Sequence, residues 1–197
     1  MQVTRAMKFQ PHIVGLGGTL RAGSASEMAM RAALTAAANA GARTTAFTGM
    51  DLSFPLYMAG GTERIEKVLR FLMSLRRCDG VIIASPSYHG TISGLLKNAL
   101  DYIEDLRSDQ RPYLDGLPIG CAVCAAGSQA AGQTLSTLRT IAHSLRAWPT
   151  PFVVTLDTSD TIFDEEGTCL RPQYARQLSE LGEQVVKFAG IYARQIG

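Results

Sequence analysis

Short apolar runs alternate five times with longer amphipathic runs along this chain. The longer runs have helical spacing; in residues 63–77, for example, apolar side chains recur every three or four positions. We predict strands at residues 12–16, 44–48, 81–84, 119–125 and 152–156. We predict helices at residues 26–40, 63–77, 94–106, 132–145 and 172–194. This alternation predicts an α/β fold, in which a doubly wound five-stranded parallel sheet has helices on both faces.

The chain has the size and composition of one globular domain. Its 197 residues contain no linker, repeat or low-complexity segment, so we predict a single domain over residues 1–197, with a loose leader at residues 1–10. Nineteen basic and seventeen acidic residues leave a net charge of +2, which argues against a nucleic-acid partner. The sequence has no apolar run of the roughly 20 residues that span a bilayer, and its first residues lack the apolar segment of a secretory signal. We therefore expect a cytoplasmic protein that has no membrane partner.

Two of the four cysteines, Cys121 and Cys124, form a C-x-x-C pattern. Such patterns occur in redox sites and in metal sites. Here the pattern falls within a predicted strand, where residues three apart point to opposite faces. Two thiols on opposite faces neither share a metal ion nor close a disulfide. We therefore predict packed, reduced thiols, and we assign no metal site.

The candidate site lies in the loops that follow the strands, because doubly wound sheets bind ligands at the carboxyl ends of their strands. The first such loop, "GGTLRAGSAS" (residues 17–26), combines a glycine pair, hydroxyls and Arg21 just before a predicted helix. Free N–H groups and a partial positive charge at a helix N-terminus favour a phosphate. Helix capping alone needs one hydroxyl and explains neither the glycines nor Arg21. The loop lacks the P-loop and dinucleotide patterns, so a terminal monophosphate is the better ligand.

The loop after the third predicted strand, "SPSYHGT" (residues 85–91), has an unusual composition. Pro86 keeps the residue before it out of helical geometry, and Gly90 lets the backbone approach a ligand closely. Tyr88 and His89 offer flat side chains. These features suit one side of a flat ring.

The loop after the fourth predicted strand, "AAGSQAAGQ" (residues 125–133), is small and polar. Its backbone amides, together with Ser128 or Gln129, can form hydrogen bonds with the edge of a ring. A flat heteroaromatic ring joined to a monophosphate describes FMN, so the residues themselves favour FMN as the cofactor.

Three stretches resemble the NAD(P)H-dependent FMN reductase family, which includes flavin, quinone, azo-dye and chromate reductases. "GGTLRAGSAS" resembles the family's phosphate loop, G-S-x-R-x-x-S-x-N. "SPSYHGTISGLLKNALDY" resembles the segment P-x-Y-N-G-S-x-P-G-x-L-K-N-A-x-D, and "DLSFPLY" resembles D-L-x-x-P-x-Y. The resemblance extends to about residue 156, and it implies a flavodoxin-like fold with strand order 2-1-3-4-5.

The resemblance assigns FMN contacts to residues in all three loops. The phosphate would be held by Thr19, Arg21, Ser24 and Ser26, the ribityl chain and ring by Pro86, Ser87, Tyr88, His89 and Gly90, and the rest of the ring by Gly127, Ser128 and Gln129. The chain departs from the family pattern with Thr19 for serine, Ser26 and His89 for asparagine, and Ser93 for proline.

The implied activity is hydride transfer from NADPH or NADH to FMN, and then to free flavin or another small-molecule acceptor. This chemistry belongs to the cofactor, so we assign no catalytic side chain.

His143, on a predicted helix, is assigned to packing or capping. Lys97 and Asp101 lie on a helix that tends to face a neighbouring subunit in the family; an i,i+4 ion pair is the simpler explanation. The apolar positions around residues 94–106 predict a homodimer or a homotetramer.

Three other functions stay open at this point. The chain could hold FMN permanently and reduce a quinone, an azo dye or chromate. It could be a flavodoxin-like electron carrier without NAD(P)H activity, although such carriers are usually acidic. It could be a hydrolase that uses Ser24 or Ser87, although the sequence shows no persuasive catalytic triad for either serine. A flavin-dependent monooxygenase that receives reduced FMN is a further candidate partner.

Overall fold

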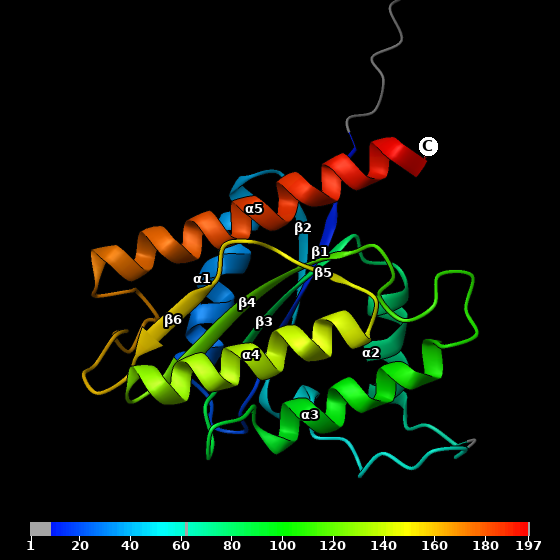
Figure 1. Cartoon of the computed structure of the whole chain (residues 1–197), viewed down its shortest axis with the longest axis horizontal. Coiled ribbons are helices and arrows are strands. Elements are labelled where there is room, and N and C mark those ends of the chain that lie inside the picture. Colours follow the sequence, from blue (N-terminus) through cyan, green and yellow to red (C-terminus); the bar gives the residue numbers. More distant parts are fainter. Residues whose placement is uncertain (1–8, 62, 197) are drawn as a thin grey trace, which may run out of the picture.

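The computed structural model describes residues 9–61 and 63–196 (Figure 1). Residues 1–8 of the predicted leader lie outside the described residues. The strands are β1 (His12–Gly17), β2 (Arg43–Phe47), β3 (Gly80–Pro86), β4 (Pro118–Ala125), β5 (Trp148–Pro149) and β6 (Val154–Asp157). The α-helices are α1 (Ala25–Asn39), α2 (Glu66–Arg76), α3 (Gly94–Asp101), α4 (Ser128–Ser144) and α5 (Pro172–Ile196). Two 3₁₀ segments occupy Gly49–Asp51 and Tyr102–Leu106.

The strands form one parallel sheet in the order β2-β1-β3-β4-β5, and β6 also pairs with β4. The predicted doubly wound fold and its strand order are confirmed. Because every strand runs in the same direction, the carboxyl ends of all the strands lie along one edge of the sheet. That edge carries the loops that the sequence identified as the candidate site.

The last predicted strand differs from the observed one. Residues 152–156 were expected to form one strand, but two short strands, β5 and β6, pair in succession with β4. The Trp148 N–H donates to the carbonyl of Leu117, the residue before β4, at 2.8 Å. The Thr150 N–H donates to the carbonyl of Ile119, in β4, at 2.9 Å. Pro149 and Pro151 have no N–H, and the Thr150 hydroxyl donates to the Phe152 carbonyl at 3.1 Å. This local bond turns the chain between the two strands.

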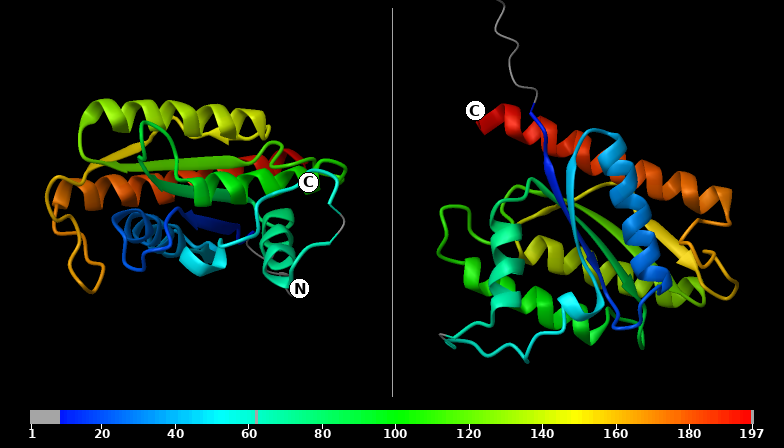
Figure 2. Two further views of the ribbon diagram at one scale, coloured as in Figure 1. Left: turned by 90° about the horizontal axis from the view of Figure 1, so that it is seen from below. Right: turned by 180° about the vertical axis from the view of Figure 1, so that it is seen from behind.

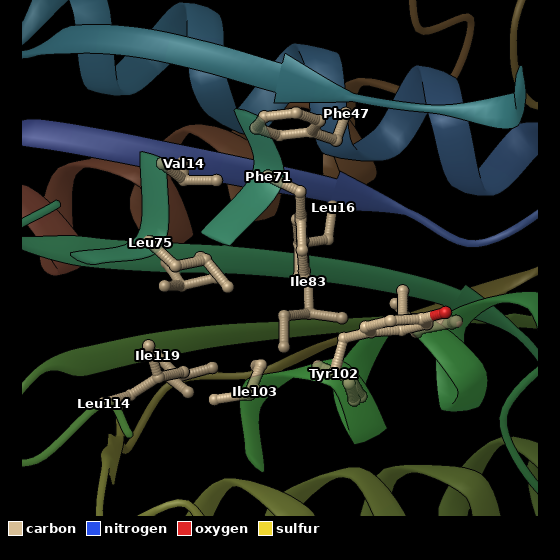
Figure 3. Packing of buried hydrophobic residues seen from close by; sticks show 14 of the residues in the cluster. Val14, Leu16, Phe47, Phe71, Leu75, Ile83, Tyr102, Ile103, Leu114 and Ile119 are labelled. Carbon is tan, nitrogen blue, oxygen red and sulfur yellow. The ribbon is translucent and has the colours of Figure 1, made fainter. Parts of the chain in front are cut away.

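Helices cover both faces of the sheet (Figure 2), and buried apolar side chains fill the space on each side. α1 and α5 pack on one face, where they cover side chains such as Ile13 and Ile82. α2, α3 and α4 pack on the other face over Val14 and Ile83. Figure 3 shows side chains of α2 and of the 3₁₀ segment after α3, such as Phe71 and Ile103, beside those of the sheet. α5 lies against α1 most closely at Gly182. The alternation of inward-facing residues along β1 and β3 therefore buries both faces of the sheet.

Three helices differ in length from the prediction. α2 begins at Glu66 rather than at residue 63, and α3 becomes a 3₁₀ helix after Asp101. α4 begins at Ser128, four residues before the expected start. Gly127 adopts φ 109° there, a conformation that favours glycine, and the N–H of Ala131 already donates to its carbonyl. Residues 128–133, most of the predicted third loop, therefore belong to the start of α4.

The two cysteines of the C-x-x-C pattern lie on opposite faces of β4, as predicted. Cys121 packs in the layer that contains α2, α3 and α4, and Cys124 packs in the layer that contains α1 and α5. Both are free and buried. Burial raises the pKa of each thiol to about 12, so neither is a thiolate near neutral pH.

If the chain has the NAD(P)H-dependent flavin reduction that the family resemblance implies, we expect a variant with both Cys121→Ala and Cys124→Ala to retain it. The two thiols contribute packing only, so the double variant should lose stability and keep its turnover number. Turnover at saturating FMN, measured on the fraction that is folded by circular dichroism, checks this. Loss of turnover in a well-folded double variant would restore a redox role for the pair.

The structure corrects the expectation that the apolar positions on residues 94–106 lack cover within one chain, from which a dimer or tetramer was predicted. The structure buries four of them in the chain's own core and partly buries the fifth: Leu96, Ala99, Leu100 and Ile103, and Leu95. The exposed large apolar side chains of this region instead lie on α2 and the loop before it: Leu56, Met58, Ile65, Leu69 and Met73. A homodimer or homotetramer stays a prediction, to be tested by sedimentation.

Candidate functional site

The first and second loops meet at the carboxyl edge of the sheet, and the second loop is also bonded to α4. The Gly18 N–H donates to the Ala84 carbonyl at 3.1 Å, which ties the loop after β1 to β3. The Ser87 N–H donates to the Cys124 carbonyl at 2.8 Å, which ties the loop after β3 to β4. These contacts place the predicted phosphate loop and the predicted ring loops along one continuous border.

The loop after β1 ends in a capped helix. The Ser24 hydroxyl accepts from the Glu27 N–H at 3.3 Å, so Ser24 is the N-cap of α1. The Ser26 hydroxyl lies 3.4 Å from that of Ser24, and both serines are buried. Arg21 is exposed beside them. Two hydroxyls, the N-terminal amides of α1 and one guanidinium suit a phosphate monoester.

Thr19 has a different role in the same loop. Its hydroxyl accepts from the Arg21 N–H at 3.0 Å and lies 3.2 Å from the Arg21 carbonyl. This hydroxyl therefore closes a local turn that presents Arg21. Glu27 also contributes to the loop, because its carboxylate accepts from the Gly23 N–H at 3.2 Å and pairs with Arg31 at 2.8 Å.

The loop after β3 folds into a two-residue turn. Tyr88 and Thr91 exchange backbone hydrogen bonds of 2.9 and 3.1 Å. His89 and Gly90, at the tip, have φ values of 52° and 80°. Positive φ at both central positions characterises the type I′ turn, for which Asn-Gly is the preferred pair. His89 therefore occupies a backbone conformation that favours asparagine or glycine, and its ring lies exposed at the tip.

This turn and the start of α4 enclose a hollow of about 570 Å³. Its lining comes from His89, Gly90, residues 126–130 and Gln133. The volume lies within the usual range of small-molecule sites. The predicted residues His89, Gly90, Gly127, Ser128 and Gln129 are therefore brought together, and the amide and hydroxyl groups among them suit the edge of a flat ring. Tyr88, at the same turn, is 52 % exposed.

Ser87 and Pro86 are placed differently. The Ser87 hydroxyl lies 2.7 Å from the Thr134 hydroxyl and 3.2 Å from the Ala130 carbonyl, so it binds α4. Pro86 is the last residue of β3 and pairs with Cys124. Both residues therefore anchor the start of the loop after β3 to β4 and α4.

Sequence reasoning missed three polar residues at this edge. Thr134 and Ser93 are buried, and each hydroxyl meets another loop of the site. Asp157 ends β6, and hydrogen bonds from the backbone and the side chain of Ser159 hold the pKa of its carboxyl below the usual range. The sequence places Asp157 directly after a predicted strand, and Ser93 stands where the family pattern has proline, so both positions carried a signal. Thr134 falls inside a helix and gave none.

Lys97, Asp101 and His143 lie away from this border. Lys97 and Asp101 form an exposed i,i+4 ion pair at 2.6 Å. Such pairs contribute only a few tenths of a kcal/mol. His143 is exposed in the last turn of α4, at the opposite end from the loops.

A model of the NADPH-dependent FMN reductase family matches residues 11–160, which include every residue of the three loops. This chain belongs to that family. The family is described as that of NADPH-dependent FMN reductases. The predicted family resemblance is confirmed.

One curated relative is similar to this chain in sequence, and solved structures are similar to it in fold. The FMN-dependent NADPH-azoreductase of Staphylococcus aureus is 30% identical over 117 residues, which cover 57% of this chain and 58% of the azoreductase. This chain thus matches less than two thirds of that relative. FerB, an NAD(P)H:(acceptor) oxidoreductase from Paracoccus denitrificans, has a similar fold, with a TM-score of 0.76, 17% identity and coverage of 92% of this chain and 98% of FerB. A WrbA-like flavodoxin from Agrobacterium tumefaciens has a TM-score of 0.61, 15% identity and coverage of 94% and 99%.

Two further observations concern membranes and metals. Within residues 9–61 and 63–196, no helix combines the length and apolar character needed to cross a membrane. In the same part of the chain, His, Cys, Asp and Glu side chains form no cluster of three or more that could hold a metal ion.

Proposed function

We propose that this chain is an NAD(P)H-dependent FMN reductase that uses the loop after β1 for the phosphate and the hollow beside His89 for the flavin ring. The observation that carries this proposal is the joining of the loops: buried hydroxyls and Arg21 at the start of α1 lie along the same border as the hollow of about 570 Å³. One ligand that combines a monophosphate with a flat ring matches both parts.

The side chains divide into binding and shaping groups. Ser24, Ser26 and Arg21 would hold the phosphate, and Thr19 would fix the turn that presents Arg21. Gly127 and the first amides of α4, with Ser128 and Gln129, would bind the edge of the ring. Gly90 would allow the backbone to approach it.

FMN, when bound, supplies the group that accepts hydride from the reduced nicotinamide and passes it on to the acceptor. The chain's own residues would orient the ring, keep one face open for the two substrates in turn, and exclude water from the other face. This division of labour requires no side chain to act as a general acid or base. The exposed side chains of Tyr88 and His89 would border the open face.

Titration with FMN and riboflavin, followed by NADPH and NADH oxidation with and without added FMN, tests the proposal. We expect saturable FMN binding and nicotinamide oxidation that depends on FMN. The absorption spectrum of the purified protein shows whether FMN stays bound, which separates a prosthetic group from a substrate. A protein that binds neither flavin and oxidises neither nicotinamide contradicts the proposal.

The azoreductase relative favours an azo dye as the acceptor, although it matches only part of each chain. Free flavin, a quinone or chromate are the alternatives, and a flavin-dependent monooxygenase is a candidate recipient of reduced FMN. Steady-state rates with each acceptor at saturating nicotinamide rank them. A carrier without nicotinamide activity would reduce none of them from NADPH or NADH. We also propose a cytoplasmic location and assembly into dimers or tetramers.

His89→Asn should change the ranking of acceptors more than the affinity for FMN. Asparagine suits the left-handed turn at least as well as histidine, so the loop should keep its shape, while the flat ring beside the hollow is lost. We expect the ratio of kcat/KM for an azo dye to that for free flavin to shift severalfold, with the FMN dissociation constant within about twofold. His143→Asn, at the far end of α4, is the matched control. A tenfold loss of FMN affinity with an unchanged ranking would contradict this role.

A further inference from the structure

Ser93 lies buried where the loop after β1 meets the segment between β3 and α3. Its hydroxyl donates to the Gly18 carbonyl. The Gly18 N–H donates to Ala84 at 3.1 Å, so both backbone groups of Gly18 are bonded to the chain that forms and follows β3. The first loop is therefore held on both sides of a single residue, Gly18.

Ser93 is itself fixed by two further hydrogen bonds. Its N–H donates to the Ser85 hydroxyl at 3.3 Å, and that hydroxyl donates to the Pro86 carbonyl at 2.8 Å. The Ser93 hydroxyl also accepts from the Leu96 N–H at 3.2 Å, which caps α3. Ser93 is thus bonded to the end of β3, to the start of α3 and to the first loop.

The fit around Gly18 leaves little room for the two loops to shift. A Cβ added at Gly18 would lie 3.1 Å from the Ser93 hydroxyl oxygen and 3.2 Å from Cδ of Pro86. Capping of α3 requires only that the hydroxyl accept from Leu96. The donation to Gly18 is a separate bond, and it reaches 75 residues back along the chain. Helix capping therefore does not account for this contact.

We infer that Ser93 is a positioning residue that sets the spacing between the phosphate loop and the ring-binding turn. The inference rests on the proposed function, because it assumes that FMN bridges these two parts. A ligand with two linked groups gains affinity only when both subsites are held at the matching separation. Ser93 supplies that separation through Gly18, and it does so without touching FMN.

The test measures the advantage that the phosphate gives, which is the ratio of the riboflavin dissociation constant to the FMN dissociation constant. Ser93→Ala removes the bond to Gly18, and a lost hydrogen bond of ordinary strength corresponds to about five- to tenfold. We expect this ratio to fall by that factor while riboflavin affinity changes by less than about twofold. Ser93→Thr keeps the hydroxyl, and it should restore the ratio. Quenching of flavin fluorescence gives both constants without any turnover.

A matched control separates positioning from loss of the α3 cap. Ala99→Gly destabilises α3 by an amount similar to a lost cap, about 1 kcal/mol, and leaves Ser93 intact. It should lower the melting temperature and leave the ratio unchanged. An unchanged ratio in Ser93→Ala, or an equal fall in Ala99→Gly, overturns the inference. If Ser93→Ala does not fold, Ser93→Cys, with its weaker donor, takes its place.

Arg21→Ala distinguishes failure of this inference from failure of the proposed function. If Arg21→Ala lowers the ratio and Ser93→Ala does not, the phosphate site stands and the positioning role is wrong. If neither variant changes the ratio, the phosphate does not bind in this loop, and the inference falls together with the proposed site.

Discussion

Arg21→Ala is expected to weaken FMN binding about ten- to a hundredfold. Arg21 is an exposed guanidinium beside the N-terminus of α1, and a phosphate monoester carries nearly two negative charges at neutral pH. A charge-assisted hydrogen bond is worth roughly 1.5–3 kcal/mol, and each 1.4 kcal/mol corresponds to a factor of ten. Flavin fluorescence titration measures the loss.

Riboflavin makes this experiment internally controlled, because it has the same ring and no phosphate. Its affinity should change by less than about twofold in Arg21→Ala. Lys97→Ala, which removes an exposed cation that is paired with Asp101 on α3, controls for the change in net charge. Equal losses for FMN and riboflavin would mean that Arg21 only shapes the loop. No loss for either ligand would move the phosphate site away from α1.

Gly182→Ala should lower the stability of the fold more than any other change considered for this chain. α5 crosses α1 at this residue, where an added Cβ would lie 2.2 Å from the Ala33 carbonyl oxygen and 3.0 Å from the Ala37 nitrogen. These are backbone atoms, so the two helices must move apart. Overpacking of this kind costs about 3 kcal/mol, which for a chain of this size lowers the melting temperature by roughly 6–12 °C.

Gly190→Ala is the matched control on the same helix. A Cβ at Gly190 meets no atom within 4 Å, so alanine adds helix propensity there without a clash. We expect this variant to be as stable as the parent chain or more stable by up to about 1 kcal/mol. Thermal unfolding followed by circular dichroism compares the two. Equal melting temperatures for the two variants would show that α1 and α5 separate at no cost.

The central strands could be predicted because burial on both faces gives them continuous apolar sequences. β1, β3 and β4 lie within two residues of their predicted bounds. The edge of the sheet was harder to predict. The pairing of β5 depends on Thr150, a polar residue between two prolines, and the sequence of Trp148–Pro149 has no strand pattern of its own. That strand exists because β4 is beside it.

The parts of the candidate site that depend on local sequence could be predicted. The residue types of the three loops indicated a phosphate and a flat ring, and parallel strands required the loops to lie at one edge. The start of α4 was misplaced because the small residues after Gly127 resemble a loop. Ser93 could not be assigned at all, since its role depends on Gly18, which is distant in sequence and is brought to it only by the pairing of β1 with β3.

The two prolines that flank Thr150 also determine how the sheet ends. Successive N–H groups of a strand point alternately toward each neighbour, and those of Trp148 and Thr150 point toward β4. The alternate positions, which would offer donors to solvent, are Pro149 and Pro151. An exposed strand edge is the usual place where a second chain adds by β-pairing and starts to aggregate. At β5 that edge has no N–H to offer at either position, so the β5 part of this border resists extension by another molecule even though Trp148 is exposed beside it.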